Sequence, residues 1–300
     1  MNPETKKPVD KKRVYDIFRE ECYDDGAEEP WSHRRRLSKT ALPDKLMEKR
    51  LDWQRYMVGL GHTAEWYYKN VIWFDLCNSI IPKTEQKATE MALAHKPKSG
   101  WISPGCQEFS RNLQGNKIHL KQNSSGTYKV WWMPVLVRGK LHVECFGADY
   151  PGECAEGAQI AAEKLRPILS IRFPNETKPK VVMTDKGKGF YDGWTSQMNP
   201  EYKTGLRKAG LRALMGEDNK IQPGQLQDLM LHETAVSWLR QKLMTNGPAK
   251  PWEETREEYR ARLQESCREI NAEHDVEGLS REFPDRLQEL REREGDRLKK

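Results

Sequence analysis

The sequence predicts an α/β protein whose mixed β-sheet is flanked by helices. Two short apolar runs each carry an acidic residue near their end, Asp75 and Asp185, and such runs are typical of buried strands. Between them, residues 128–146 form a hairpin pattern with Arg138–Gly139 as its turn. Amphipathic helical patterns separate and follow these strands. Strands joined both by a tight turn and across helices give a sheet with antiparallel and parallel neighbours.

The first predicted elements lead into the strand that carries Asp75. Residues 42–59 have the apolar spacing of a helix, which Gly59 and Gly61 end. Residues 63–68 form a short amphipathic turn, and residues 70–78 form the strand itself.

Asp75 needs an explanation, because aspartate is disfavoured in strands and is rarely buried without a partner. One explanation is that the strand ends there and Asp75 turns out to water. The other is a site shared with Asp185, because two strands that each end in a carboxylate can bring these groups together at one edge of a sheet. Two such carboxylates do not both ionise cheaply at close range without a cation between them. The pair therefore favours a divalent metal site.

Residues 79–126 show no clear periodicity and predict a long insertion. From Lys83 to Lys140 the chain carries ten Lys or Arg residues against three Glu, an excess of +7, while the whole chain carries +6. A localised excess of this kind is the expected footprint of a phosphate-binding surface. A solvated, lysine-rich loop explains it equally well.

The second half of the chain alternates helices with short strands. In chain order we expect a helix over 155–169, a strand over 180–185, a helix over 202–209 closed by Gly210, a strand over 211–215, and helices over 225–243, 252–270 and 284–300.

The composition indicates a soluble protein inside the cell. The 300 residues correspond to one or two domains, and the polar first residues do not form a signal peptide. No apolar run reaches the roughly 18 residues of a membrane helix, so we expect no membrane partner. The six cysteines fit neither a zinc site nor a disulfide framework. The basic cluster over 32–36 indicates phosphate contact or nuclear import, so we expect a nuclear or other intracellular location.

A third acid is needed if two metal ions are to be held, and the helix over 225–243 offers Asp228 and Glu233. Asp228 also suits the helix dipole as a simple cap, and Asp218 lies in a loop pattern. Three carboxylates around two Mg²⁺ ions about 3.5–4 Å apart can activate a water or a 3′-hydroxyl and stabilise the leaving oxygen. The acids therefore make phosphodiester chemistry a candidate function.

The order of these elements and acids resembles the RNase H-like core of DDE/D transposases, specifically the mariner superfamily. The stretches that carry the resemblance are residues 37–53, 63–75, 182–185, 226–239 and 283–295. The resemblance implies that Asp75, Asp185 and Glu233 are the catalytic and metal-binding acids, with Mg²⁺ or Mn²⁺ as cofactor. It also implies DNA as the partner, a homodimer as one assembly, and strand cleavage followed by strand transfer.

Four features depart from that family. Asp185 and Glu233 are 48 positions apart, which implies an insertion around 191–203. Lys186 stands where the family commonly has Asn, and the usual prolines before the last acid are partly missing. The family carries two helix-turn-helix units before its core, but only 36 residues precede Leu37, so we expect an N-terminally truncated chain. Residues 9–18 resemble at most the last recognition helix, and a lone surface helix explains them as easily.

The expected organisation has three parts. Residues 1–36 are a remnant of the DNA-binding region and linker, residues 37–248 are the RNase H-like core with the basic insertion over 79–126, and residues 249–300 are charged helices. The residues expected to contact DNA are Arg34, Arg35, Arg36, Lys96, Lys98, Arg111, Lys117 and Lys121.

Three functions stay open at this point. The first is a metal-dependent transposase or endonuclease. The second is an inactive or domesticated relic that binds nucleic acid without chemistry, which the short N-terminal region and the altered motifs favour. The third is a protein that binds partners through the charged helices from Trp252 onward, although these helices are explained more simply as solvated faces.

Overall fold

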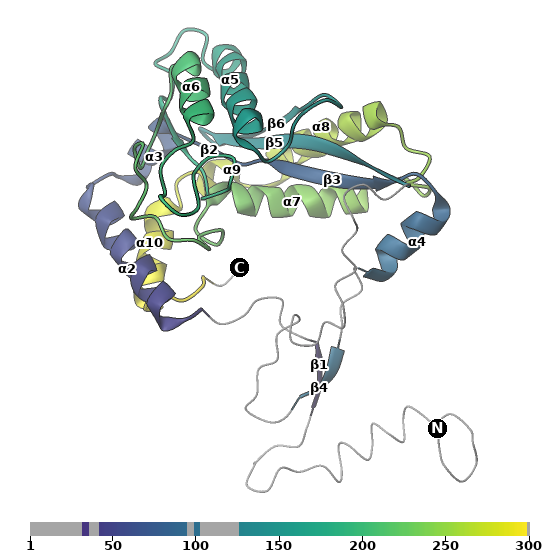
Figure 1. The fold of residues 1–300 in the computed structure, drawn as a ribbon, viewed down its shortest axis with the longest axis horizontal. Coiled ribbons are helices and arrows are strands. Elements are labelled where there is room, and N and C mark those ends of the chain that lie inside the picture. Colours follow the sequence, from purple (N-terminus) through teal and green to yellow (C-terminus); the bar gives the residue numbers. More distant parts are fainter. Residues whose placement is uncertain (1–31, 36–41, 95–98, 103–125, 299–300) are drawn as a thin grey trace, which may run out of the picture. The chain divides into compact units, whose positions relative to one another are not determined.

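The computed structural model describes residues 32–35, 42–94, 99–102 and 126–298 (Figure 1). The chain divides into two compact units, Met1–Ala41 with Thr89–Ser124 and Leu42–Ala88 with Ser125–Lys300. In the first unit, strand β1 (Ser32–Arg35) pairs antiparallel with β4 (Ser99–Ile102). The helix expected over residues 9–18 lies outside the described residues.

The second unit is built on one mixed sheet. Its strands are β2 (Val71–Phe74), β3 (Cys77–Pro82), β5 (Thr127–Val137), β6 (Lys140–Cys145), β7 (Val181–Met183) and β8 (Arg212–Ala213). β2 and β3 pair with the same long strand β5 in one unbroken register, with Phe74 opposite Val135 and Cys77 opposite Trp132. They therefore act as a single strand that is interrupted only at Asp75 and Leu76.

The order across the sheet is β6, β5, the β2/β3 strand, β7 and β8. β5 and β6 run antiparallel to their neighbours, whereas β7 and β8 run parallel to β2. The mixed sheet predicted from the sequence is confirmed. Arg138 and Gly139 both have positive φ, 42° and 68°, which matches the tight turn predicted between β5 and β6.

One face of the sheet is covered by α5 (Ala155–Arg172) and α6 (Pro200–Ala209) (Figure 1). The two helices approach closely at Gly205, where an added Cβ would lie 2.6 Å from the Gln159 carbonyl oxygen. Gly210 ends α6 at φ 74°, as predicted.

The opposite face is covered by six helices from two parts of the chain. They are α2 (Asp44–Gly59), α3 (Ala64–Asn70), α7 (Leu231–Thr245), α8 (Arg256–Glu273), α9 (Val276–Leu279) and α10 (Phe283–Glu292). α8 and α10 are rich in charge, yet each buries an apolar stripe; Phe283, for example, packs its ring 4.8 Å from that of Trp73. These helices are part of the core rather than fully solvated appendages.

Three predicted helix boundaries were wrong. The helix expected from residue 225 begins at Leu231, because Pro223 and Gly224 precede a residue with positive φ, Gln225 at 60°. The helix expected from residue 252 begins at Arg256, after a capping box formed by Thr255 and Glu258. The last helix ends at Glu292 rather than near residue 300, because Glu294 and Gly295 both have positive φ.

The segment expected as an insertion over 79–126 contains regular structure at its start. β3 extends to Pro82, and α4 (Glu85–Ala94) follows it. Within the described parts of the chain, no helix combines the length and the apolar character needed to cross a membrane.

Candidate catalytic acid cluster

Asp75 lies at the interruption of the β2/β3 strand. Side chains two positions apart on a strand lie on the same face. Asp75 therefore shares a face with Trp73 and Cys77, which belong to the core that α7 covers. The Leu76 backbone N–H donates to Asp75 Oδ1 at 2.7 Å. This bond fixes one carboxylate oxygen while the side chain stays half-buried.

Asp185 follows β7, the strand next to β2. The two strands pair in parallel, with Val71 opposite Val181 and Trp73 opposite Met183. When this register is continued by two residues, Asp75 lies level with Asp185. The Gly187 backbone N–H donates to Asp185 Oδ1 at 2.8 Å. The sheet thus brings the two predicted acids to neighbouring positions on the same face.

Glu233 comes from a different part of the chain, the first turn of α7. Ligand atoms of Asp75, Glu233 and His232 lie within 4.8 Å of one another. His232 is fully buried, whereas the two carboxylates are half-buried. The N-terminal turn of a helix favours negative charge, so α7 supports a carboxylate at this position.

Like charges dominate the electrostatics of this cluster. Burial, followed by the negative charges of Asp185, Glu233 and Glu153, raises the pKa of Asp75 well above its ordinary value, against the hydrogen bond from Leu76. Burial also raises the pKa of Asp185, against the hydrogen bond from Gly187. Mutual repulsion of this kind is what a bound cation relieves.

Two residues near the cluster were missed from the sequence. His232 precedes Glu233 at the start of α7, and its proximity to Asp75 follows only from the packing of α7 on the sheet. Glu153 lies in the loop after β6, and its pKa is raised by burial and by the charge of Asp185. Only the fold brings this loop near β7, so no spacing in the sequence pointed to Glu153.

The segment between Asp185 and α6 is an ordered loop. Asp192 Oδ1 accepts hydrogen bonds from the Trp194 and Thr195 backbone N–H groups, at 3.0 and 2.6 Å. Lys186 Nζ donates to Ser196 Oγ at 2.7 Å and ties the loop to the residue after Asp185. Trp194 extends from this loop with 98% of its side chain exposed. This loop lies where the wide spacing between the second and third acids implied an insertion.

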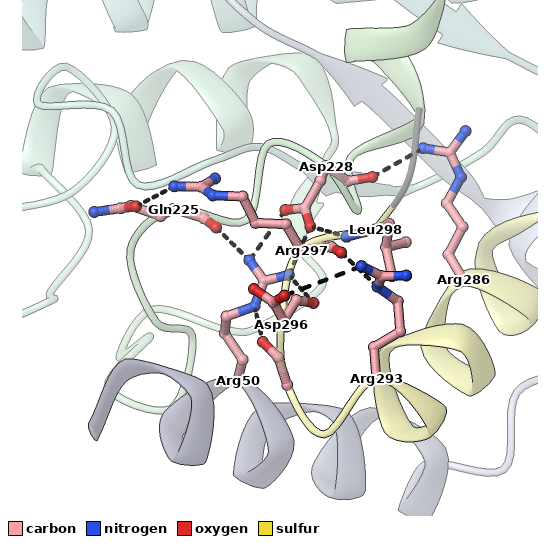
Figure 2. A network of polar contacts seen from close by, with 9 residues as sticks. Arg50, Gln225, Asp228, Arg286, Arg293, Asp296, Arg297 and Leu298 are labelled. Carbon is pink, nitrogen blue, oxygen red and sulfur yellow. Dashed lines mark hydrogen bonds and ion pairs between the residues drawn. The ribbon is translucent and has the colours of Figure 1, made fainter. Parts of the chain in front are cut away.

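Asp228, the other acid weighed on this segment, has a different role. It lies before α7 and forms a buried ion pair with Arg50 of α2 (Figure 2). The backbone N–H of Leu298 also donates to Asp228 Oδ2, at 2.9 Å. Asp228 therefore joins α2 to the C-terminal tail and is not a helix cap.

The residues expected to contact DNA lie mostly outside the described parts of the chain. Arg36, Lys96, Lys98, Arg111, Lys117 and Lys121 are all in this group. Arg34 and Arg35 belong to β1, where they pair with Gly100 and Ser99 of β4. Their contact with DNA stays a prediction.

The sheet order and the two helical layers define an RNase H-like α/β core. The chain is similar to the solved catalytic domain of Mos1 mariner transposase, with a TM-score of 0.55 and 10% identity over 88% of this chain and 100% of that one. It is also similar to the Mos1 transposase paired-end complex with the left transposon end, with a TM-score of 0.55 and 14% identity over 96% of this chain and 71% of that one. A Mos1 paired-end complex with Mg gives the same TM-score at 13% identity, over 96% of this chain and 72% of that one.

At these identities the likeness shows a shared fold. No family model matches the sequence, and no curated protein matches it.

Proposed function

We propose that this chain is the catalytic core of a DDE-type transposase or a closely related endonuclease, which cleaves DNA strands and transfers the freed ends. The observations that carry the proposal are the proximity of Asp75 to Glu233 in the first turn of α7 and the β2–β7 register, which makes Asp185 level with Asp75. The shared fold with a mariner transposase catalytic domain supports it. A DNA substrate implies action in the nucleus or elsewhere inside the cell.

The donor set suits a hard divalent cation such as Mg²⁺ or Mn²⁺. Carboxylate oxygens are the ligands these ions prefer, and the two largest causes of the raised pKa of Asp75 are burial and the negative charge of Asp185. Asp75, Asp185 and Glu233 would hold the metal, with His232 beside Asp75 and Glu233. When bound, such an ion supplies Lewis acidity that activates a water or a 3′-hydroxyl and stabilises the leaving oxygen.

The chain's own groups have defined tasks in this proposal. The Leu76 and Gly187 amides each hold one oxygen of an aspartate, and the second oxygen is the one that would bind the metal. The first turn of α7 orients Glu233 toward Asp75. Carboxylates held in this way do not have to reorganise when charge develops on a phosphate, and such preorganisation is a major source of catalysis.

Nicking of supercoiled plasmid DNA tests this proposal. We expect wild-type protein to nick the plasmid with Mg²⁺ or Mn²⁺ and not with EDTA. Asp185→Asn should reduce the rate at least 10²-fold, because the change keeps the shape of the side chain and removes a charged ligand. The exposed Glu48→Gln variant on α2 controls for loss of negative charge and should nick as wild type does.

Two outcomes would count against the proposal. Nicking by Asp185→Asn at the wild-type rate would show that the acid cluster does not carry the activity. If folded wild-type protein binds the plasmid without metal-dependent nicking, the chain is a DNA-binding protein without chemistry.

A further inference from the structure

A basic pocket lies at the outer edge of the sheet, away from the acid cluster. It has a volume of about 380 Å³ and is formed by β6, α5 and α8. The residues that line it are Lys140, Leu141, His142, Val143, Arg172, Gln264, Cys267, Arg268 and Asn271. Three cations and a histidine thus line a pocket that contains no carboxylate.

Side chains of α8 bond to the backbone of β6 beside the pocket. Asn271 of α8 pairs with Leu141 of β6, because its Nδ2 donates to the Leu141 carbonyl oxygen at 2.8 Å and its Oδ1 accepts from the Leu141 N–H at 2.8 Å. Cys267 Sγ lies 3.3 Å from the same carbonyl oxygen. These contacts fix α8 against the edge strand on this side of the pocket.

The positive charge of the pocket is largely uncompensated. Within the described parts of the chain, neither Lys140 nor Arg172 forms an ion pair, and Arg268 pairs only with Glu265, an exposed neighbour on its own helix. Positive groups gathered in a cleft without counter-charges attract an anion.

Among the buried polar atoms that have no hydrogen-bond partner in the described residues, two belong to residues of this pocket. They are Nε of Arg172 and Nε2 of His142, both at this pocket. Buried polar atoms in folded proteins are nearly always hydrogen-bonded. An oxyanion in the pocket would provide acceptor oxygens for Arg172 and for the imidazole, and the planar guanidinium groups suit a phosphate in particular.

The pKa of His142 is consistent with the positive charge around it. Burial, with the charges of Arg172 and Lys140, lowers the pKa of His142 to about 4. A bound dianion would offset those two charges and raise this pKa. His142 therefore provides an internal reporter of anion binding.

From this geometry we infer that the pocket formed by Lys140, His142, Arg172 and Arg268 binds a phosphate group. The register pairs His142 with Val135, which pairs in turn with Phe74. Two strand spacings, roughly 10 Å, therefore separate the histidine from the strand that carries Asp75. The group is either free phosphate or a phosphodiester of a nucleic-acid backbone, which share this chemistry. The inference stands without the acid cluster and does not need the proposed function.

Calorimetric titration of the full chain with inorganic phosphate, in EDTA and at constant ionic strength, tests the inference. We expect saturable binding to wild type and at least tenfold weaker binding to Arg172→Gln and Arg268→Gln. Arg268 lies at the surface, so its variant keeps the test valid if Arg172→Gln fails to fold. Arg291→Gln, an exposed change on α10, should bind phosphate as wild type does.

The pKa of His142, measured by NMR, gives a second test. This pKa should not change with phosphate if the basic residues have only a structural role. Saturating phosphate should raise the pKa of His142, and the resonance is assigned by its loss in His142→Gln. A short DNA duplex identifies the source of the phosphate. Competition between duplex and phosphate indicates a nucleic-acid backbone, whereas phosphate binding without competition indicates free phosphate.

The inference is overturned if wild type gives no more heat with phosphate than with matched chloride. It is also overturned if Arg268→Gln and Arg291→Gln bind phosphate equally well.

Discussion

Arg50 and Asp228 form a bidentate ion pair with no exposed side-chain surface, although they are 178 positions apart in the chain. Their atoms meet at 3.0 Å (Nη1 to Oδ1) and 2.6 Å (Nη2 to Oδ2). Arg50 also donates to the carbonyl oxygens of Gln225 and Gly295, at 2.5 and 2.8 Å (Figure 2). One guanidinium thus joins α2, the segment before α7 and the C-terminal tail.

Breaking this pair should destabilise the fold strongly. We expect Arg50→Met and Asp228→Asn each to lower the free energy of unfolding by about 3–5 kcal/mol, because each leaves buried polar groups without their charged partner. Urea unfolding followed by circular dichroism measures this. Arg55→Met is the matched control on the same helix, since Arg55 pairs with Asp52 at the surface, and its cost should stay below about 1 kcal/mol. Equal costs for Arg50→Met and Arg55→Met would contradict this role for the buried pair.

Neutralising one acid of the cluster should stabilise the protein when no metal is present. Asp75 and Asp185 repel each other, so Asp185→Asn should raise the free energy of unfolding in EDTA at pH 8 by about 1 kcal/mol. That corresponds to an increase in Tm of roughly 2–4 °C for a domain of this size. Thermal unfolding measures the Tm of wild type, Asp185→Asn and the control variant Glu48→Gln. A lower Tm for Asp185→Asn in EDTA would mean that the carboxylate stabilises the fold instead of serving a ligand.

The contact between α5 and α6 depends on the absence of a side chain at Gly205. An added Cβ would lie 2.6 Å from the Gln159 carbonyl oxygen, so Gly205→Val should cost at least about 1–3 kcal/mol. Gly59, at the end of α2, has no neighbour within 4 Å of an added Cβ. Gly59→Ala should therefore raise stability by about 0.4–1 kcal/mol. Chemical denaturation measures the free energy of unfolding of both variants. If Gly205→Val leaves this free energy unchanged, the close approach of α5 and α6 is disproved.

His142 should make stability depend on pH in weak acid. Its pKa is about 4 in the folded chain and 6.5 in the ordinary state, so between these values the unfolded chain binds more protons. Stability then rises with pH through this window and falls on acidification. In phosphate-free buffer, wild type should lose on the order of 1–3 kcal/mol relative to His142→Gln between pH 6.5 and 4. Parallel stability curves for the two proteins would rule out this contribution.

The mixed sheet and the neighbouring positions of Asp75 and Asp185 could be predicted from the sequence, because both depend on local patterns of residues. The apolar strands that precede Asp75 and Asp185 follow from local composition, and the turn at Arg138 and Gly139 follows from turn chemistry. Glu233 was chosen by resemblance, and the structure brings it to Asp75. The catalytic roles of all three acids stay predictions.

Other features required the tertiary structure. The partner of Asp228 is 178 positions away, so a nearby role as a helix cap was the simpler expectation. Glu153 and His232 reach the cluster only because the loop after β6 and the start of α7 come close to the carboxyl ends of β2 and β7. The basic pocket is formed by residues from β6, α5 and α8. The count of charges along the sequence indicated residues 83–140 instead.

Mn²⁺ titration by isothermal calorimetry, with wild type and the variants Asp75→Ala, Asp185→Ala and Glu233→Ala, tests the central claim most directly. We expect wild type to bind Mn²⁺ and each variant to bind it at least tenfold more weakly, while Glu48→Gln binds as wild type does. Circular dichroism would establish that every variant is folded. If folded wild type binds no Mn²⁺ even with DNA present, or if the three variants bind it as tightly as wild type, the acid cluster is not a metal site.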